Sequence, residues 1–369
     1  MNNENSIRVL ISALLLILIS IPLQQSHSDT EEITVIAIGD ITIGSNLTPT
    51  IEKHGAGVFF EGTASVIRSA DVATASLNTS ISERGEPDPR SKLHFRAVPE
   101  LARALANAGF DAVSLATPHI LDFGVEALED TLTHLEWYNV KPMGAGITPA
   151  AANAPVWLDV KSKKVALLSY LRGNEFNMAS LNVVASAAFS QMTSAVKEIN
   201  DTAEIVIVWL HWGKQESDEN AQQSSIGRQR IFAQALIDAG ADLVLCQQLH
   251  TLGGIELYEG KPIIYSLADF IYETYSLQYA RTIIPKVSYA EGVLKSIELI
   301  PILADKPGVS FPQPSLLKTK DTTKESLDVN LEETAIETLR EYQKRCAALK
   351  TEVIIKGERG WINSINNSQ

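Results

Sequence analysis

Short apolar runs alternate with segments of helical periodicity along most of the chain. The runs are rich in β-branched residues and have the length of buried strands, at 33–38, 112–116, 165–170, 204–210, 243–246, 263–267 and 292–303. Between them, apolar positions recur at helical spacing over 97–108, 125–137, 228–239 and 332–350. Strands that alternate with helices are typical of an α/β fold, and they argue against an all-β sandwich or a helical bundle.

The N-terminal segment has the pattern of a targeting signal. An apolar run at 9–23 is shorter than the about 20 apolar residues that a membrane-spanning helix needs. Soon after it, Ser26-His27-Ser28 has the small-x-small form of a signal-peptide cleavage site. We therefore expect residues 1–28 to direct export, either as a signal peptide that is removed or as a membrane anchor that is kept. The protein would then be secreted, periplasmic or membrane-anchored.

Length, composition and charge narrow the class of protein further. A chain of 369 residues, 45% apolar and 20% charged, is globular and long enough to bury a sizeable core. We expect one domain over 29–305 and a C-terminal extension, 306–369, that contains the last helix. The net charge of −13 disfavours binding to nucleic acid, because phosphate contacts need Lys or Arg. Cys246 and Cys346 are the only cysteines, which excludes a disulfide framework and leaves open whether they pair.

Polar residues with the chemistry of a metal site follow several of the predicted strands. Asp40 comes after the first strand, and His119, His211 and His250 come after later ones. In sheets wound with helices, ligands bind beyond the carboxyl ends of the strands. Histidine with a carboxylate is the usual ligand set of a hydrolytic metal ion. We therefore expect these four side chains to converge in one cleft, although they are far apart in the sequence.

Seven segments carry a resemblance to a known family, and they stand in the family's order over about residues 33–300. They include Ile38-Gly39-Asp40, His211-Trp212-Gly213 and the motif Ala116-Thr117-Pro118-His119-Ile120-Leu121-Asp122-Phe123-Gly124, with further matches at 108–111, 143–146, 238–244 and 264–267. The sequence resembles the CapA family of poly-γ-glutamate capsule-synthesis proteins. The resemblance implies a four-layer α-β-β-α sandwich of metallophosphoesterase type, and a part in making or exporting an anionic polymer at the cell surface.

The resemblance also assigns roles to individual residues. It places His119 and Asp122 at the catalytic positions, with His119 over the substrate. It places Asp40, His211 and His250 at the metal-binding positions. Anionic polymer and envelope-assembly proteins are the partners that it implies, together with the membrane if the N-terminus is kept.

Several positions depart from the family's pattern, and each change removes a metal ligand or alters charge. Where the family has Asn-Leu-Glu, the chain has Ser76-Leu77-Asn78, so a bridging carboxylate is replaced by a neutral amide. Pro118 replaces an asparagine, Gln248 replaces a histidine, and Asp269 replaces an asparagine. Amides bind divalent transition metals poorly, and a two-metal hydrolase needs a bridging anion. We therefore expect a degenerate site that holds either no ion or one weakly bound divalent ion.

Three functions remain open on the sequence alone. The first is a noncatalytic or weakly catalytic component of capsule-polymer assembly or export. The second is an active metal-dependent hydrolase of a phosphoester or γ-glutamyl bond. The third is a cell-surface module that binds a ligand in the old active-site cleft without chemistry. Metal content separates the first two, and binding to the polymer tests the third.

Overall fold

The structure, a computed structural model, describes residues 31–173, 182–212, 219–247, 250–273, 281–303, 315–316 and 331–364. By its contacts the chain divides into residues 1–31 and 32–369, and the fold below is that of the second unit. The expected leader, 1–28, lies outside the described residues. None of the helices in the described part is long and apolar enough to span a membrane.

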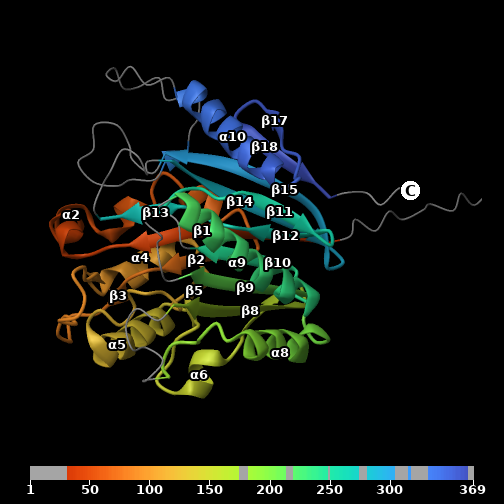
Figure 1. Ribbon diagram of the computed structural model, residues 1–369. Coiled ribbons are helices and arrows are strands. Elements are labelled where there is room, and N and C mark those ends of the chain that lie inside the picture. Colours follow the sequence, from red (N-terminus) through yellow and green to blue (C-terminus); the bar gives the residue numbers. More distant parts are fainter. Residues whose placement is uncertain are drawn as a thin grey trace, which may run out of the picture. The chain divides into compact units, whose positions relative to one another are not determined.

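The strands form two large sheets and one small one (Figure 1). The first sheet has ten strands, with the order β17-β18-β15-β14-β1-β2-β5-β6 and with β13 paired to β1 and β16 to β15. Its strands are β1 Glu32–Thr42, β2 Val72–Leu77, β5 Ala112–Ser114, β6 Lys141–Met143, β13 Asp269–Tyr272, β14 Arg281–Ala290, β15 Val293–Leu303, β16 Ser315–Leu316, β17 Ile354–Lys356 and β18 Arg359–Asn363. The second sheet has the order β11-β12-β10-β9-β8-β7. Its strands are β7 Val156–Val160, β8 Lys163–Arg172, β9 Ile205–Trp212, β10 Leu243–Gln247, β11 Ile255–Tyr258 and β12 Lys261–Ile264.

Helices and one short strand pair complete the described elements. The α-helices are α2 Thr48–His54, α3 Ala64–Ile67, α4 Glu100–Ala108, α5 Gly124–Trp137, α6 Pro149–Asn153, α8 Phe189–Asn200, α9 Glu219–Asp238 and α10 Leu331–Ala348, and the 3₁₀ helices are η1 Ser45–Leu47 and η2 Ala56–Phe59. The small sheet pairs β3 Ser80–Ile81 with β4 Arg96–Ala97. This pairing explains one difference from the sequence prediction. The helix expected from residue 97 begins at Glu100, because Ala97 pairs with Ile81 as a strand.

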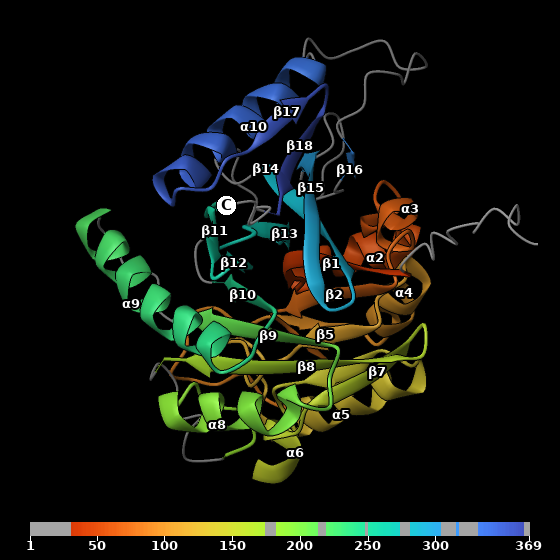
Figure 2. The ribbon, with the colours of Figure 1, turned by 90° about the vertical axis from the view of Figure 1, so that its right-hand side faces the viewer.

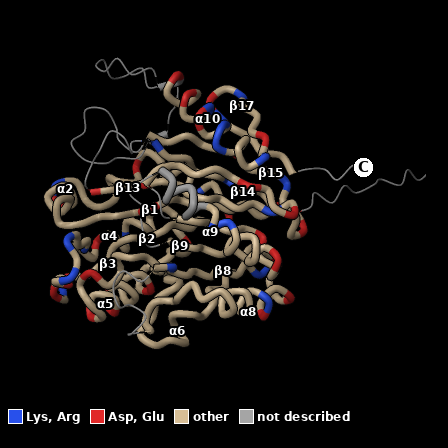
Figure 3. Tube along the Cα trace, in the orientation of Figure 1, with Lys and Arg blue, Asp and Glu red and all other residues tan. Residues whose placement is uncertain are grey.

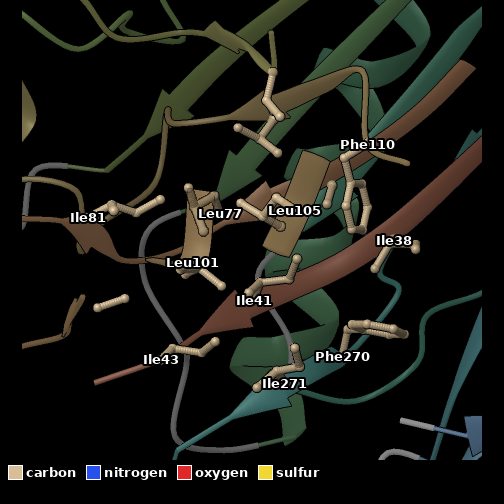
Figure 4. Packing of buried hydrophobic residues seen from close by; sticks show 14 of the residues in the cluster. Ile38, Ile41, Ile43, Leu77, Ile81, Leu101, Leu105, Phe110, Phe270 and Ile271 are labelled. Carbon is tan, nitrogen blue, oxygen red and sulfur yellow. The ribbon is translucent and has the colours of Figure 1, made fainter. Parts of the chain in front are cut away.

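Successive side chains of a strand point to opposite faces of its sheet, and this alternation produces the layers. In β1, Val35 and Ala37 belong to a buried cluster shared with the second sheet. Ile36 and Ile38 belong to another cluster, on the opposite face, that includes residues of α2, α4 and α5. Figure 4 shows Ile38 and Ile41 in this second cluster, with Leu101 and Leu105 of α4. A strand with both faces buried must lie between two layers of structure.

The second sheet is covered on its outer face in the same way. Val206 and Val208 of β9 pack in a third cluster with residues of α8 and α9. Figure 2 shows α9 on one side of the paired sheets and α2 to α4 on the other. Inside, Trp209 Nε1 donates to Thr74 Oγ1 across the two sheets, at 3.1 Å. The expected four-layer α-β-β-α arrangement is therefore confirmed.

The C-terminal segment, which the sequence sets apart as an extension, joins the first sheet. Residues 296–299 of β15 pair with residues 360–363 of β18. Helix α10 places Leu339, Tyr342 and Cys346 in the cluster between the sheets. Cys346 and Cys246 are both buried and unpaired in the described structure. Figure 3 shows acidic and basic residues distributed over the outer elements of the fold, including α10.

Candidate functional site

A β-bulge turns Asp40 toward the second sheet. The register between β1 and β2 shifts between Ile38 and Asp40. Ile38 and Ile41 both face the helices on the outer side, so the bulge leaves Asp40 on the inner face. The Asp40 N–H donates to the Ala268 carbonyl at 3.2 Å. A Cβ on Gly39 would lie 2.1 Å from that carbonyl oxygen, so glycine alone permits this approach.

His211, from β9 of the second sheet, faces Asp40 across the gap between the sheets. Its Nδ1 lies 4.0 Å from Asp40 Oδ1, and both side chains are buried. Burial, followed by the charges of His119 and His250, lowers the pKa of His211 to about 3. His211 is therefore neutral at physiological pH. Burial, followed by the charge of Asp269, raises the pKa of Asp40 to about 7.

His250 forms a tight pair with Asp269, the first residue of β13. His250 Nδ1 lies 2.9 and 3.0 Å from the two carboxylate oxygens of Asp269. Asp269 is buried, and it lies opposite Asp40 in the β1–β13 pairing. Burial alone would lower the pKa of His250, but the hydrogen bond and charge of Asp269 outweigh it and raise the pKa. The His250 ring lies 5.2 Å from that of Tyr272.

His119 forms a second pair of the same kind, with Asp122. His119 Nδ1 lies 2.8 Å from Asp122 Oδ2, and Asp122 is buried. The same oxygen accepts the backbone N–H of Phe95 at 2.8 Å. The Phe95 ring meets His119 edge-on at 4.7 Å and lies 5.9 Å from Tyr272. Phe95 therefore holds both members of the pair.

The structure brings the four predicted residues together. Asp40 and His211 face each other directly, and His211 lies close enough to His119 and His250 for their charges to affect its pKa. Phe95 and Tyr272 link the rings of His119 and His250. The assignment of these residues as ligands or catalysts stays a prediction.

Four of the five predicted degenerate positions lie at the same place. Ser76 is opposite Asp40 in the β1–β2 pairing, and Asn78 follows on the same face. Pro118 is half-buried beside His119, and Asp269 is the partner of His250 described above. Gln248 lies outside the described residues.

Unsatisfied polar atoms gather at this point. Eight buried side-chain polar atoms lack a hydrogen-bond partner in the described part of the chain, and five of them come from the ends of β1, β2 and β9. These five are Asp40 Oδ1, Thr42 Oγ1, Ser76 Oγ, Asn78 Oδ1 and His211 Nδ1. Each can accept a hydrogen bond or bind a cation, so together they fit a positively charged group.

Among the described residues, the same donors carry too little negative charge for a two-ion centre. Asp40 is the one carboxyl group among the five unsatisfied atoms, and Asp269 is committed to His250. Neutral oxygens such as that of Asn78 cannot offset two divalent charges.

Sequence reasoning missed three residues that shape the site, Phe95, Tyr272 and Gln247. Gln247 Nε2 donates to the Ala268 carbonyl at 2.8 Å, and its Oε1 accepts the N–H of Leu267 at 3.2 Å. It therefore fixes the strand connection before Asp269. Gln247 directly follows the predicted strand at 243–246 and stands three positions before His250, and that position was the available signal. Phe95 and Tyr272 carry no polar signal of their own.

The chain matches known proteins over the region that carries the site. The sequence profile described as "Bacterial capsule synthesis protein PGA_cap" matches residues 34–274. The capsule biosynthesis protein CapA of Bacillus anthracis is 23% identical over 257 residues, covering 67% of this chain and 61% of that protein. The PGA biosynthesis protein CapA of Bacillus subtilis is 27% identical over 260 residues, covering 68% and 66%. The chain thus spans less than two thirds of the length of both relatives.

Among solved structures, a hypothetical protein from Thermus thermophilus is similar, with a TM-score of 0.47 and 17% identity. The alignment covers 73% of this chain and 98% of that one. The family profile, by contrast, covers more than half of the chain, and it includes Asp40, His119, His211, His250 and Asp269. The chain therefore belongs to the bacterial capsule synthesis protein PGA_cap family.

Proposed function

We propose that this protein is exported and takes part in the synthesis or export of a poly-γ-glutamate-type capsule polymer. Its family supports this role, as do the names of its relatives, a capsule biosynthesis protein and a PGA biosynthesis protein. Export is supported by the apolar run at 9–23 and by Ser26-His27-Ser28. An anionic polymer and the proteins that assemble the envelope are the partners that this role requires.

The site within this proposal is a reduced metal centre. The observation that carries it is the set of five unsatisfied atoms, in which Asp40 alone supplies a carboxyl group and Asn78 supplies a neutral oxygen. Within this proposal, at most one divalent ion would be held by Asp40, His211 and His250, with water completing its shell. When bound, such an ion would polarise a substrate oxygen or a water molecule.

A second candidate function is hydrolysis of a phosphoester or a γ-glutamyl bond, and the His119–Asp122 pair favours it. His119 Nδ1 donates a hydrogen bond to Asp122 Oδ2 at 2.8 Å, which leaves Nε2 as the ring nitrogen available for proton transfer. A buried carboxylate that orients a histidine in this way is a common device of acid–base catalysis. The pair needs no ion to hold its geometry.

Metal content and turnover, measured together, test the site. Full-length protein would be loaded with excess zinc or manganese, freed of unbound ions, and assayed for bound metal and for hydrolysis of a generic phosphodiester. We expect fewer than two ions per chain and little turnover. Asp159→Ala is the matched control for Asp40→Ala, because Asp159 is an exposed carboxylate paired with Lys164. Two tightly held ions, with turnover lost in Asp40→Ala alone, would establish the hydrolase instead.

Cell fractionation tests export and the role in capsule formation. We expect the protein outside the cytoplasm, either starting near Asp29 or still attached through residues 9–23, as N-terminal sequencing would show. Cells that lack the gene should carry less γ-linked polymer on their surface. Full-length protein found solely in the cytoplasm, with normal polymer in its absence, would contradict the proposal.

A further inference from the structure

Helix α10 contacts the segment that begins at His250. Arg345 Nη1 donates to the Leu252 carbonyl at 2.6 Å, and the Ile255 N–H donates to Cys346 Sγ at 3.3 Å. Between these contacts the two backbones nearly touch, since a Cβ on Gly254 would lie 2.8 Å from the Arg345 carbonyl oxygen. The helix therefore supports residues 252–255 directly.

Residues 252–255 are in turn paired with the segment that leads into Asp269. Leu252 and Leu267 form an antiparallel bridge, and the Gly253 N–H donates to the Ser266 carbonyl at 2.9 Å. His250 stands two residues before Leu252, and Asp269 stands two residues after Leu267. The two bridged segments thus carry His250 and Asp269, and α10 packs against the segment that follows His250.

The helix is itself firmly held. Arg345 also pairs with Glu341 at 2.6 Å, and Tyr342 and Cys346 are buried between the sheets. Just after the helix, Thr351 Oγ1 accepts the N–H of Leu257 at 3.1 Å. All of these helix residues lie beyond residue 274, where the match to the family profile ends.

We propose that α10 is a positioning element for the site, and that Arg345 fixes the His250–Asp269 pair through the Leu252 carbonyl. The C-terminal segment outside the family region then completes a site whose other residues lie within it. This role rests on the proposed function, because it concerns the same site. The test measures the His250 signal directly. The positioning role of α10 can therefore be disproved while the proposed role in capsule synthesis remains supported.

The test is nuclear magnetic resonance of full-length protein with ¹⁵N-labelled histidine. The His250 and His119 signals would be assigned from His250→Gln and His119→Gln. In Arg345→Ala we expect the Nδ1 proton of His250 to exchange with water at least about tenfold faster, because a hydrogen bond from a charged donor is lost. The Nδ1 proton of His119, held by Asp122, should be unchanged. Arg345→Lys retains a donor and should restore most of the protection.

Two further variants guard against a simple loss of stability. Arg359→Ala removes a contact at 3.1 Å to Glu298, which joins the same C-terminal segment to β15, and should leave both histidines unchanged. Glu341→Gln loosens Arg345 without removing it, and should speed exchange at His250 by a smaller factor. Equal changes at His250 and His119, or no change at His250 in the Arg345 and Glu341 variants, would overturn the proposal.

Discussion

Asp40 and Asp269 lie opposite each other in the parallel pairing of β1 and β13. The two residues are 3% and 2% exposed. Asp269 binds His250, whereas Asp40 Oδ1 has no hydrogen-bond partner in the described structure. Burial, together with the charge of Asp269, raises the pKa of Asp40 to about 7. Asp40 therefore has one buried carboxylate oxygen that a proton or a cation can satisfy.

This relationship predicts how the ion-free protein responds to pH. The pKa of Asp40 is about 7 in the folded state, whereas its ordinary value of 3.8 applies to the unfolded chain. As pH rises, the unfolded chain therefore loses the proton first. Between these values, rising pH favours unfolding. With a chelator present, we expect Asp40→Asn to raise the free energy of unfolding at pH 8 by up to about 4 kcal/mol, and by much less at pH 4. Urea unfolding at both values measures the difference.

Asp71 offers a control of opposite sign. Despite partial burial, hydrogen bonds from Lys161 and Thr34 lower its pKa, so its charge stabilises the fold above the unfolded value. Asp71→Asn should therefore destabilise the protein at pH 8. Asp40→Asn would speak against the assignment of Asp40 if it destabilised the ion-free protein in the same way.

Restoring the missing carboxylate should make stability depend on an ion. Asn78→Glu adds a negative charge to the site that already holds Asp40 and Asp269. Without metal we expect a loss of about 1–3 kcal/mol, because the new charge is buried without a partner. Manganese should recover this loss, since the site then has two carboxylates for the ion. Thermal unfolding with and without manganese measures both effects.

The neutral variant Asn78→Gln separates charge from size. It should lose some stability through crowding, with no recovery on addition of manganese. A similar response of the Glu and Gln variants to the ion would show that position 78 does not face a metal site.

The strand connection before Asp269 contains a backbone strain that one substitution can relieve. Ala268 has a φ of 59°, a left-handed conformation that costs an L-residue roughly 1–2 kcal/mol. Glycine adopts it readily but loses roughly 0.5–1 kcal/mol through its greater freedom in the unfolded chain. Ala268 is also fully buried, so the lost methyl group costs about 0.8 kcal/mol. We therefore expect Ala268→Gly to leave the free energy of unfolding nearly unchanged, as measured by urea unfolding.

Ala166, in the middle of β8, provides the comparison for this change. It is buried, and its φ is not in the left-handed region, so Ala166→Gly should destabilise by roughly 0.5–1 kcal/mol. Destabilisation of equal size at both positions would show that the strain at Ala268 is already relieved elsewhere.

The strand ends could be predicted because their signal is local. A polar residue directly after an apolar run, as at Asp40 or His211, reveals both the strand and the edge of the sheet at which its side chain lies. The alternation of apolar runs and helices likewise predicted an α/β fold, whereas the four layers were implied by the resemblance to the CapA family. The turning of Asp40 by the bulge at Gly39 was not visible, because it depends on the pairing of β1 with β2 and on the approach of Ala268.

The supporting residues could not be predicted, because their contacts are long-range. Arg345 meets Leu252 across 93 positions, and Phe95 meets Asp122 across 27. Neither Arg345 nor Phe95 stands in a motif, and both act on the site through another residue. The four residues predicted to form the site were thus visible in the sequence, whereas the framework that holds them was not.

Phe95 makes the last prediction, since it contacts His119 through its ring and Asp122 through its backbone. Phe95→Leu keeps the backbone N–H that donates to Asp122 but removes the ring edge 4.7 Å from His119. We expect the protein to lose about 1–2 kcal/mol of stability through the smaller buried side chain, and the His119 Nδ1 proton to exchange faster with water. Thermal unfolding and the ¹⁵N-histidine spectrum measure the two effects.

Phe110→Leu is the matched control, because Phe110 is also buried and meets Phe60 edge-on at 5.8 Å in the cluster beside α4. It should lose stability to a similar extent while the His119 signal stays unchanged. If both variants speeded exchange of the His119 Nδ1 proton equally, the effect would come from a general loss of stability. If only Phe95→Leu does so, the ring holds His119 at the angle from which it faces the site, and Asp122 alone is not sufficient.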